Sequence, residues 1–152
     1  MKNKLDKVEA IVKELLKQMS VEAKITIEED KENEVVLLDL QSEDNALLVG
    51  YHGKNLAAFQ IILGLLIHKK LGEWVHLVVD IDNYRQKRES QLEEMAMRAV
   101  EQAGSTGQSI AIADLTPGER RYVHILLDSN KQVETYSEGE GRNRQLIIKL
   151  ID

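Results

Sequence analysis

Apolar residues recur every three or four positions near the start of the chain, from Leu5 to Met19, with lysines and acids between them. This spacing places the apolar residues on one stripe and predicts a helix over residues 3–19. Two runs of alternating or β-branched apolar residues follow, 23–27 and 35–40, and the charged stretch 29–34 separates them. These runs predict a β-hairpin.

Helical spacing returns in the next part of the chain. A short apolar stretch, 45–49, leads into a segment with two glycines, 50–53, and residues 56–70 then have the pattern of a helix. Alternation of apolar and polar residues over 74–82 predicts a third strand.

The second half of the chain has a different pattern. A long polar helix with one apolar side is predicted from Asn83 to near Gly104, followed by a loop over residues 104–107. Thr116-Pro117-Gly118-Glu119 has the spacing of a capping box with proline at the first helical position, and predicts a helix to about Leu127. The remaining strands are predicted over 109–113, 133–137 and 145–151, and a turn at 138–143 joins the last two.

The resulting order is α-β-β-α-α-β over residues 1–82 and α-β-α-β-β over residues 83–152, which predicts an α+β protein of two small domains. The length of 152 residues, 43% hydrophobic and 30% charged, suits folded globular domains. The N-terminus is charged where a secretory signal would be apolar, no apolar run is long enough to span a membrane, and cysteine is absent. We therefore expect a cytoplasmic protein without direct membrane insertion.

Acidic residues are unevenly distributed in this chain, whose formal net charge is −6. An acidic protein is not expected to coat nucleic acid indiscriminately, because such binding is mainly phosphate neutralisation by Lys and Arg. Carboxylates are missing, however, from residues 45–72 and 141–151, where lysines, arginines and histidines occur. These two segments predict local anion-binding sites.

The first of these segments contains Gly50-Tyr51-His52-Gly53-Lys54. Two glycines allow a sharp turn close to a ligand, and the amides at the start of a helix can meet a phosphate. Many such glycine pairs merely connect helices, so the pair alone is weak evidence. Its place in an α-β-β-α-α-β order is the arrangement of a type II KH domain, in which a GXXG loop clamps the backbone of a single strand.

A second group of cations lies on the helix expected after Thr116. Arg120 and His124 are four residues apart and share a helical face, where guanidinium and imidazole groups can hold a phosphate or stack on a base. The alternative is a solvated helix face with a histidine bonded to a neighbouring backbone group.

The sequence context of four aromatic residues predicts which of them stack on bases and which lie in the core. Tyr51 and Tyr122 lie beside the two basic motifs and are the candidates for base stacking. We expect Phe59 and Trp74, in contrast, to lie in the core.

Catalytic chemistry is not expected. Asp80 and Asp82 could share one face of a strand, but solvated or ion-paired carboxylates explain them, and no nucleophile with its base is apparent. Metal-ligand spacing is absent among the histidines, which are His52, His68, His76 and His124. We predict no enzyme, no metal site and no cofactor.

Four long segments in a fixed order carry a resemblance to a known family. They are LLVGYHGKNLAAFQIIL, VVDIDNYRQKRESQLEEMA, LTPGERRYVHILL and VETYSEGEGRNRQLIIKL. Through them, residues 48–152 resemble the bacterial Jag family, also called SpoIIIJ-associated proteins, in which a type II KH domain is followed directly by a domain named for its Arg-x-x-x-His (R-3-H) motif. Residues 1–47 fit the first KH helix and the hairpin by pattern.

The resemblance implies binding of single-stranded nucleic acid, RNA above all and single-stranded DNA as an alternative, in RNA-linked regulation associated with the cell envelope, division or sporulation. Matching positions in the resemblance assign the residues of the KH clamp and of the second site. Three further arginines are added to the second site from their charge and position in this sequence. The clamp residues are Gly50, Tyr51, His52, Gly53 and Lys54; the second site is Arg120 and His124; the additions are Arg121, Arg142 and Arg144.

Two departures from the family pattern change the expectation. Family members place a basic residue inside the GXXG loop, whereas this loop has Tyr51-His52, so we expect weaker phosphate attraction at neutral pH and stacking by Tyr51. Longer members carry an additional N-terminal domain and a charged linker, which we do not expect within residues 1–152. The resemblance of residues 48–152 therefore does not extend to membrane-insertase or division partnerships that depend on that domain.

Two further expectations concern interactions. Arg85 and Arg88 on the junction helix can serve either a domain contact or a phosphate, and structural pairing with Glu89 or with an acid of the first domain is the favoured expectation. The alternative function is a protein-binding adapter that uses these folds as a scaffold, with a protein partner or a second copy bound.

Overall fold

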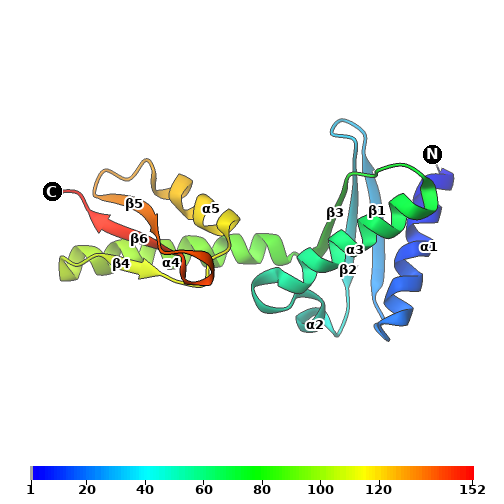
Figure 1. Ribbon diagram of the computed structural model, residues 1–152, viewed down its shortest axis with the longest axis horizontal. Helices are drawn as coiled ribbons and strands as arrows, with labels where there is room; N and C mark the ends of the chain where they lie inside the picture. Colours follow the sequence, from blue (N-terminus) through cyan, green and yellow to red (C-terminus); the bar gives the residue numbers. More distant parts are fainter. Residues whose placement is uncertain (1) are drawn as a thin grey trace. The chain divides into compact units, whose positions relative to one another are not determined.

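The computed structural model describes residues 2–152, and the chain divides into two compact units, Met1–Arg85 and Gln86–Asp152 (Figure 1). Each unit contains a sheet of three strands and its own cluster of buried hydrophobic side chains.

The first unit has a sheet in the order β1-β2-β3, in which β1 and β2 are antiparallel and β2 and β3 are parallel. The predicted α-β-β-α-α-β order is confirmed. Its elements are α1 (Lys2–Gln18), β1 (Lys24–Asp30), β2 (Val35–Gln41), α2 (Asn45–Val49), the short 3-10 helix η1 (Tyr51–Gly53), α3 (Lys54–Leu71) and β3 (Leu77–Ile81).

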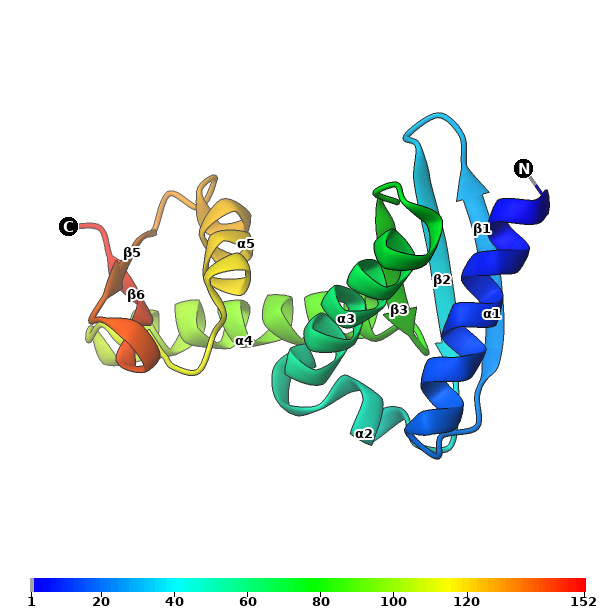
Figure 2. The same ribbon diagram turned by 45° about the vertical axis from the view of Figure 1, so that its right-hand side comes forward.

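Helices α1 and α3 cover one face of this sheet (Figure 2). Alternation along the strands turns one set of side chains toward the helices, and Leu38 and Val79 are fully buried there beside Val12 and Leu63. The other set faces away, and Leu37 is 41% exposed. The parallel connection from β2 to β3 requires a crossover, which α2 and α3 provide. This crossover contains the two glycines of the GXXG segment.

The second unit has an antiparallel sheet in the order β4-β6-β5, and the predicted α-β-α-β-β order is confirmed. Its core brings together Ala96 of α4, Val123 of α5 and Ile148 of β6, all fully buried. Its elements are α4 (Tyr84–Thr106), which begins just before the division between the units, β4 (Ile110–Ile112), α5 (Pro117–Leu127), β5 (Val133–Glu138), the 3-10 turn η2 (Gly141–Asn143) and β6 (Gln145–Leu150).

The loop predicted over residues 104–107 is wrong for its first three residues, because α4 continues to Thr106. The apolar stripe of the helix ends at the fully buried Ala103, and the exposed residues 104–106 continue the helix beyond it, with the Ser105 and Thr106 hydroxyls donating to the Gln102 carbonyl. The glycine that ends the helix is Gly107, with φ +69° and its N–H donating to the Ala103 carbonyl at 2.9 Å.

The prediction for the two large aromatic residues is half right. Phe59 is 5% exposed and belongs to the core of the first unit. Trp74 is 67% exposed, because β3 begins only at Leu77 and Trp74 lies in the connection before it.

Candidate nucleic-acid interface

The GXXG segment is a tight turn that joins α2 to α3. Gly50, His52 and Gly53 have φ values of +67°, +52° and +77°, so three of its four residues lie in the left-handed region. A Cβ atom at Gly53 would lie 2.8 Å from the ring of Tyr84, so the position requires glycine for space as well as for conformation. The local backbone therefore explains both glycines of the motif.

A side chain of α3 fastens this turn. The amide of Asn55 donates from Nδ2 to the Leu47 carbonyl of α2 at 2.7 Å, and the Gly53 N–H donates to the Gly50 carbonyl at 3.4 Å. Gly53 is the N-cap of α3 and has no side chain to bond the first-turn amides. These amides, together with the positive end of the helix dipole, can meet an anionic ligand.

Tyr51, His52 and Lys54 surround the turn. The Tyr51 and His52 rings stack with centroids 3.9 Å apart, and Lys54 Nζ lies 5.4 Å from the centre of the Tyr51 ring. Tyr51 is 59% exposed and Lys54 is exposed. The structure thus brings the five predicted clamp residues together as one surface feature with an aromatic ring, a cation and the first-turn amides of α3.

The helix that carries the second motif begins as predicted. Thr116 is the N-cap of α5: its hydroxyl accepts from the Glu119 N–H at 3.2 Å, and the Glu119 carboxylate accepts from the Thr116 N–H at 3.0 Å. Glu119 also forms an ion pair with Arg88 of α4 at 2.7 Å, and each side chain is only 12% exposed. The start of α5 is therefore fixed to α4.

Both junction arginines make structural contacts. Glu119 of α5 pairs with Arg88, because the packing of α5 and α4 in one core brings that carboxylate to the guanidinium. Arg85 bonds through its guanidinium to the Val79 carbonyl and to Gln60 Oε1. Both arginines therefore have structural roles.

An open pocket of about 420 Å³ lies beside α5, and we call it the arginine pocket. It brings together four of the predicted site residues, three from α5 and one, Arg144, from between η2 and β6. Of the eight described residues that line it, none is a carboxylate; they are Pro117, Arg120, Arg121, His124, Tyr136, Ser137, Arg144 and Leu146. Arg142, also predicted, lies in η2 and does not line this pocket.

Hydrogen bonds to the protein orient three of the four basic side chains that line the pocket. Arg120 donates from Nη1 to the Leu115 carbonyl at 2.7 Å, and Arg144 donates from Nη1 to the Gly139 carbonyl at 3.0 Å. His124 Nδ1 bonds to the hydroxyl of Thr135. Each guanidinium keeps further N–H donors, which suits it to hold a phosphate group.

The tyrosine that lines the arginine pocket is Tyr136 and not Tyr122, the candidate named from the sequence. Tyr122 donates its hydroxyl to Glu93 of α4 at 2.7 Å, and this hydrogen bond, with burial and the charges of Glu93 and Glu89, raises the pKa of Tyr122 to about 12. Tyr136, which the sequence analysis missed, lines the arginine pocket and is 45% exposed. Its place in the motif segment VETYSEGEG was the signal that could have identified it.

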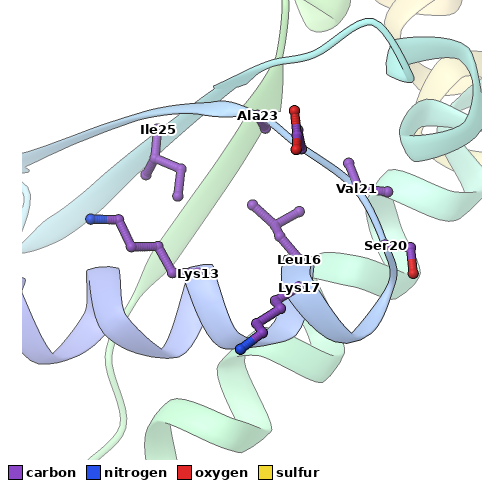
Figure 3. A pocket seen from close by; sticks show the side chains of 8 residues that line it. Lys13, Leu16, Lys17, Ser20, Val21, Ala23 and Ile25 are labelled. Atoms are coloured by element: carbon purple, nitrogen blue, oxygen red, sulfur yellow. The ribbon is translucent and has the colours of Figure 1, made fainter.

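Another pocket, of about 500 Å³, lies between the end of α1 and β1 (Figure 3). Lys13 and Lys17 lie at its rim and Leu16, Val21 and Ile25 supply its apolar surface. Lys13 is already paired with Glu9 at 2.6 Å, and no predicted site residue lines this pocket. It is therefore separate from the candidate interface.

Two other properties bear on the site. Within residues 2–152, no group of three or more His, Asp or Glu side chains is placed to hold a metal ion. None of the helices in this part of the chain is both long and apolar enough to cross a membrane.

Comparison with known proteins gives matches over both units. The family model described as KhpA/KhpB, KH domain matches residues 6–81, and the model of the R-3-H domain matches residues 90–150. A protein of Bacillus subtilis (strain 168) named RNA-binding protein KhpB is 34% identical over 126 residues, which cover 82% of this chain and 60% of the relative.

Relatives with the same name occur in other bacteria. The protein of Clostridium symbiosum is 28% identical over 145 residues, which cover 95% of this chain and 65% of the relative. That of Lactiplantibacillus plantarum is 28% identical over 136 residues, covering 90% of this chain and 42% of the relative. The chain thus spans less than two thirds of the length of each of these proteins.

Proposed function

Because the chain belongs to the bacterial Jag family, in which a KH domain is followed by an R-3-H domain, we propose that it binds single-stranded RNA without catalysing a reaction. The observation that carries the proposal is the arginine pocket, where three guanidinium groups and an imidazole meet without a carboxylate in a chain of net charge −6. A site that concentrates cations in an acidic protein attracts phosphate locally. The relatives named RNA-binding protein support the same class of ligand.

The two sites are proposed to bind the strand in different ways. At the GXXG turn, the amides of Gly50–Gly53 and the ammonium of Lys54 hold the sugar-phosphate backbone, while Tyr51 stacks on a base. In the arginine pocket, Arg120, Arg121 and Arg144 hold phosphate and Tyr136 offers a second ring. His124 completes this set, and Arg142 of η2, outside the pocket, is proposed as an additional contact to the strand.

The cellular role is part of the proposal. We place the protein in the cytoplasm, in RNA-linked regulation associated with the cell envelope, division or sporulation. The domains are proposed as residues 1–82 for KH and 83–152 for R-3-H. A protein-binding adapter is the competing function, favoured by the net charge and by exposed apolar side chains such as Ile61, which is 64% exposed.

The test is fluorescence anisotropy of labelled single-stranded RNA, single-stranded DNA and duplex RNA at low and physiological salt. We expect saturable binding that favours single-stranded RNA, with log K falling against log salt by about 0.7 for each phosphate contact. Apolar contacts to a protein would respond little to salt. Absence of binding to every probe at low salt would overturn the proposal of RNA binding and favour the protein-binding adapter instead.

A matched pair of variants tests the arginine pocket. Arg121→Glu reverses an exposed charge at the pocket and should weaken RNA binding about tenfold or more, since a charge-assisted hydrogen bond contributes about 1.5–3 kcal/mol. Lys131→Glu makes the same charge change on an exposed residue of the same unit, outside the pocket. Equal weakening by both would show a general charge effect and would remove the pocket from the proposal.

A further inference from the structure

Trp74 is the single tryptophan of the chain and lies in the connection between α3 and β3. It is 67% exposed, although tryptophan is a large side chain that is highly buried on average. Exposed aromatic rings are typical of binding surfaces, where one flat face contacts a ligand. This position calls for an explanation beyond packing.

A histidine holds the indole in a fixed orientation. The rings of Trp74 and His68 are parallel within 4° and their centroids are 4.0 Å apart. His68 lies on the last turn of α3 and is half-buried, and its Nδ1 atom is buried without a hydrogen-bond partner among the residues that the structure describes. The contact that the His68 imidazole makes with Trp74 is therefore ring stacking, which supports the indole from one side. The pair is an ordered platform rather than a loose side chain.

The pocket beside Trp74 indicates what kind of ligand fits. It has a volume of about 360 Å³, and two lysines, Lys4 and Lys31, line it together with two glutamates, Glu29 and Glu34. Lys4 is also paired with Glu73 at 2.9 Å. Because these charges balance, the pocket does not concentrate phosphate as the arginine pocket does. A flat, uncharged aromatic group that stacks on the indole is the ligand that suits it.

Resting on the proposed function, we propose that Trp74 is a stacking platform for an unpaired base of the bound RNA, additional to the GXXG turn and the arginine pocket. Every base has an aromatic face, so such a platform tolerates sequence and favours the stronger stacking purines. Two exposed lysines, Lys69 and Lys70, follow His68 on the same helical turn and offer charge for the strand on either side of the stacked base.

The platform is separated from the GXXG turn by most of α3. Lys54 begins this helix and His68 lies fourteen residues later, which corresponds to about 21 Å at 1.5 Å per residue. A strand must therefore extend well beyond the four nucleotides of a KH clamp before it reaches both features. This separation makes the two contacts distinguishable by oligonucleotide length.

The unique tryptophan provides the test. Emission of Trp74 in the full chain is titrated with oligo(A), oligo(U) and duplex RNA, while anisotropy of the same labelled strands reports overall binding. We expect emission to be quenched as the single strands saturate, more by oligo(A) than by oligo(U), and not by the duplex. Quenching should require strands longer than about four nucleotides if one strand engages both sites.

Variants connect the spectroscopic signal to affinity. Trp74→Leu should weaken binding of long single strands about 5- to 100-fold, the range of one lost base stack, and Trp74→Phe should largely preserve it. Leu65→Ala, at an apolar residue that is 54% exposed in the same unit, is the control and should leave affinity unchanged. Circular dichroism and thermal melting verify that each variant folds.

The possible failures are separable. Binding detected by anisotropy without a change in Trp74 emission would overturn the stacking platform, and so would unchanged affinity of Trp74→Leu. In either case RNA binding would still stand as the function, and the exposed indole would be explained by a contact with a protein. Absence of binding to every strand would instead overturn the proposed function and the platform with it.

Discussion

Hydrogen bonds to the protein hold Arg120, Arg144 and His124 before any ligand arrives. A guanidinium has five N–H donors, and Arg120 uses one of them on the Leu115 carbonyl. A long side chain that is already ordered loses less rotamer entropy on binding, so its contacts contribute more of their energy to affinity. The same reasoning applies to Tyr51, which is stacked on His52.

Lys54 is expected to contact the RNA backbone at the GXXG turn. Lys54→Glu should lower affinity for single-stranded RNA about tenfold and reduce the salt slope by about 0.7, because one phosphate contact is lost. Glutamate in the first turn of α3 suits the helix dipole, so folding should be retained. The measurement is anisotropy over a range of salt concentrations.

The control for this variant is Lys7→Glu, the same charge change on an exposed residue of α1. An equal loss of affinity in both variants would contradict a specific role for Lys54. Gly53→Asp is a poorer test of the turn, because the left-handed conformation and the Tyr84 ring both oppose a side chain there.

Local spacing predicted some side-chain positions and not others. Arg120 and His124 line one pocket because residues four apart share a helical face, whatever the rest of the fold does. The carboxylate that binds Tyr122 is twenty-nine residues away on α4, and the residue that pairs with Arg88 is thirty-one residues away on α5. Such partners depend on tertiary packing, which the spacing of residues does not contain.

Helices α4 and α5 are joined through Glu119, which caps α5 and pairs with Arg88. Glu119→Gln keeps an oxygen for the cap but leaves the Arg88 charge, 12% exposed, without its carboxylate. Breaking a fully buried ion pair costs about 3–5 kcal/mol; this pair is partly buried, so we expect the free energy of unfolding to fall by a smaller amount, about 2 kcal/mol. Equilibrium unfolding in urea measures this change in the free energy of unfolding.

Glu94→Gln is the matched control, because Glu94 pairs with Arg98 one turn along α4 with both side chains mostly exposed. An exposed pair of this kind contributes less than about 0.5 kcal/mol. Similar effects of Glu119→Gln and Glu94→Gln would contradict the structural role assigned to the Arg88 pair.

Strands β2 and β3 place Asp39 directly opposite Asp80. Burial, with the charges of Asp80 and Asp82, raises the pKa of Asp39 above its ordinary value. The folded state then holds the proton more tightly than the unfolded state, so stability falls as pH rises from about 3.9 through the raised pKa. Asp39→Asn should therefore raise Tm at pH 7 and raise it less at pH 4.

The comparison for Asp39→Asn is Glu43→Gln, which removes one charge from an exposed residue near β2. Thermal unfolding followed by circular dichroism should show no comparable increase for it. An increase in Tm that is equal at pH 4 and pH 7 would contradict ionisation of Asp39 as the cause.

Elements with a local chemical signal were predicted best. The capping box fixed the start of α5 at Thr116, because both of its hydrogen bonds lie within four residues. The end of α4 lacks such a signal: the helix continues through the exposed residues 104–106 and ends where the Gly107 N–H donates to the Ala103 carbonyl. Trp74 was placed in the core because alternation alone does not show where sheet pairing begins.

The chain carries two candidate sites on two units, each with its own core. Their order along the chain and the family were accessible from the sequence, because long motifs mark both. When two sites engage one strand, the second binding step occurs at an effective concentration set by the linkage, in the millimolar range for short flexible linkers. The affinity of the whole chain for one strand then exceeds the modest affinity of each site alone.

A pair of charge reversals tests whether one strand engages both sites. On an RNA of about twenty nucleotides, Lys54→Glu and Arg121→Glu should each weaken binding about tenfold, and the double variant should weaken it by the product, about a hundredfold. On an RNA of about five nucleotides, which fills one site only, each single variant should weaken binding about twofold or less, because the other site still binds. Anisotropy with both lengths gives the comparison. Equal, small effects of each single variant at both lengths would mean that the sites bind separate strands, and affinity would then be a property of each unit rather than of their linkage.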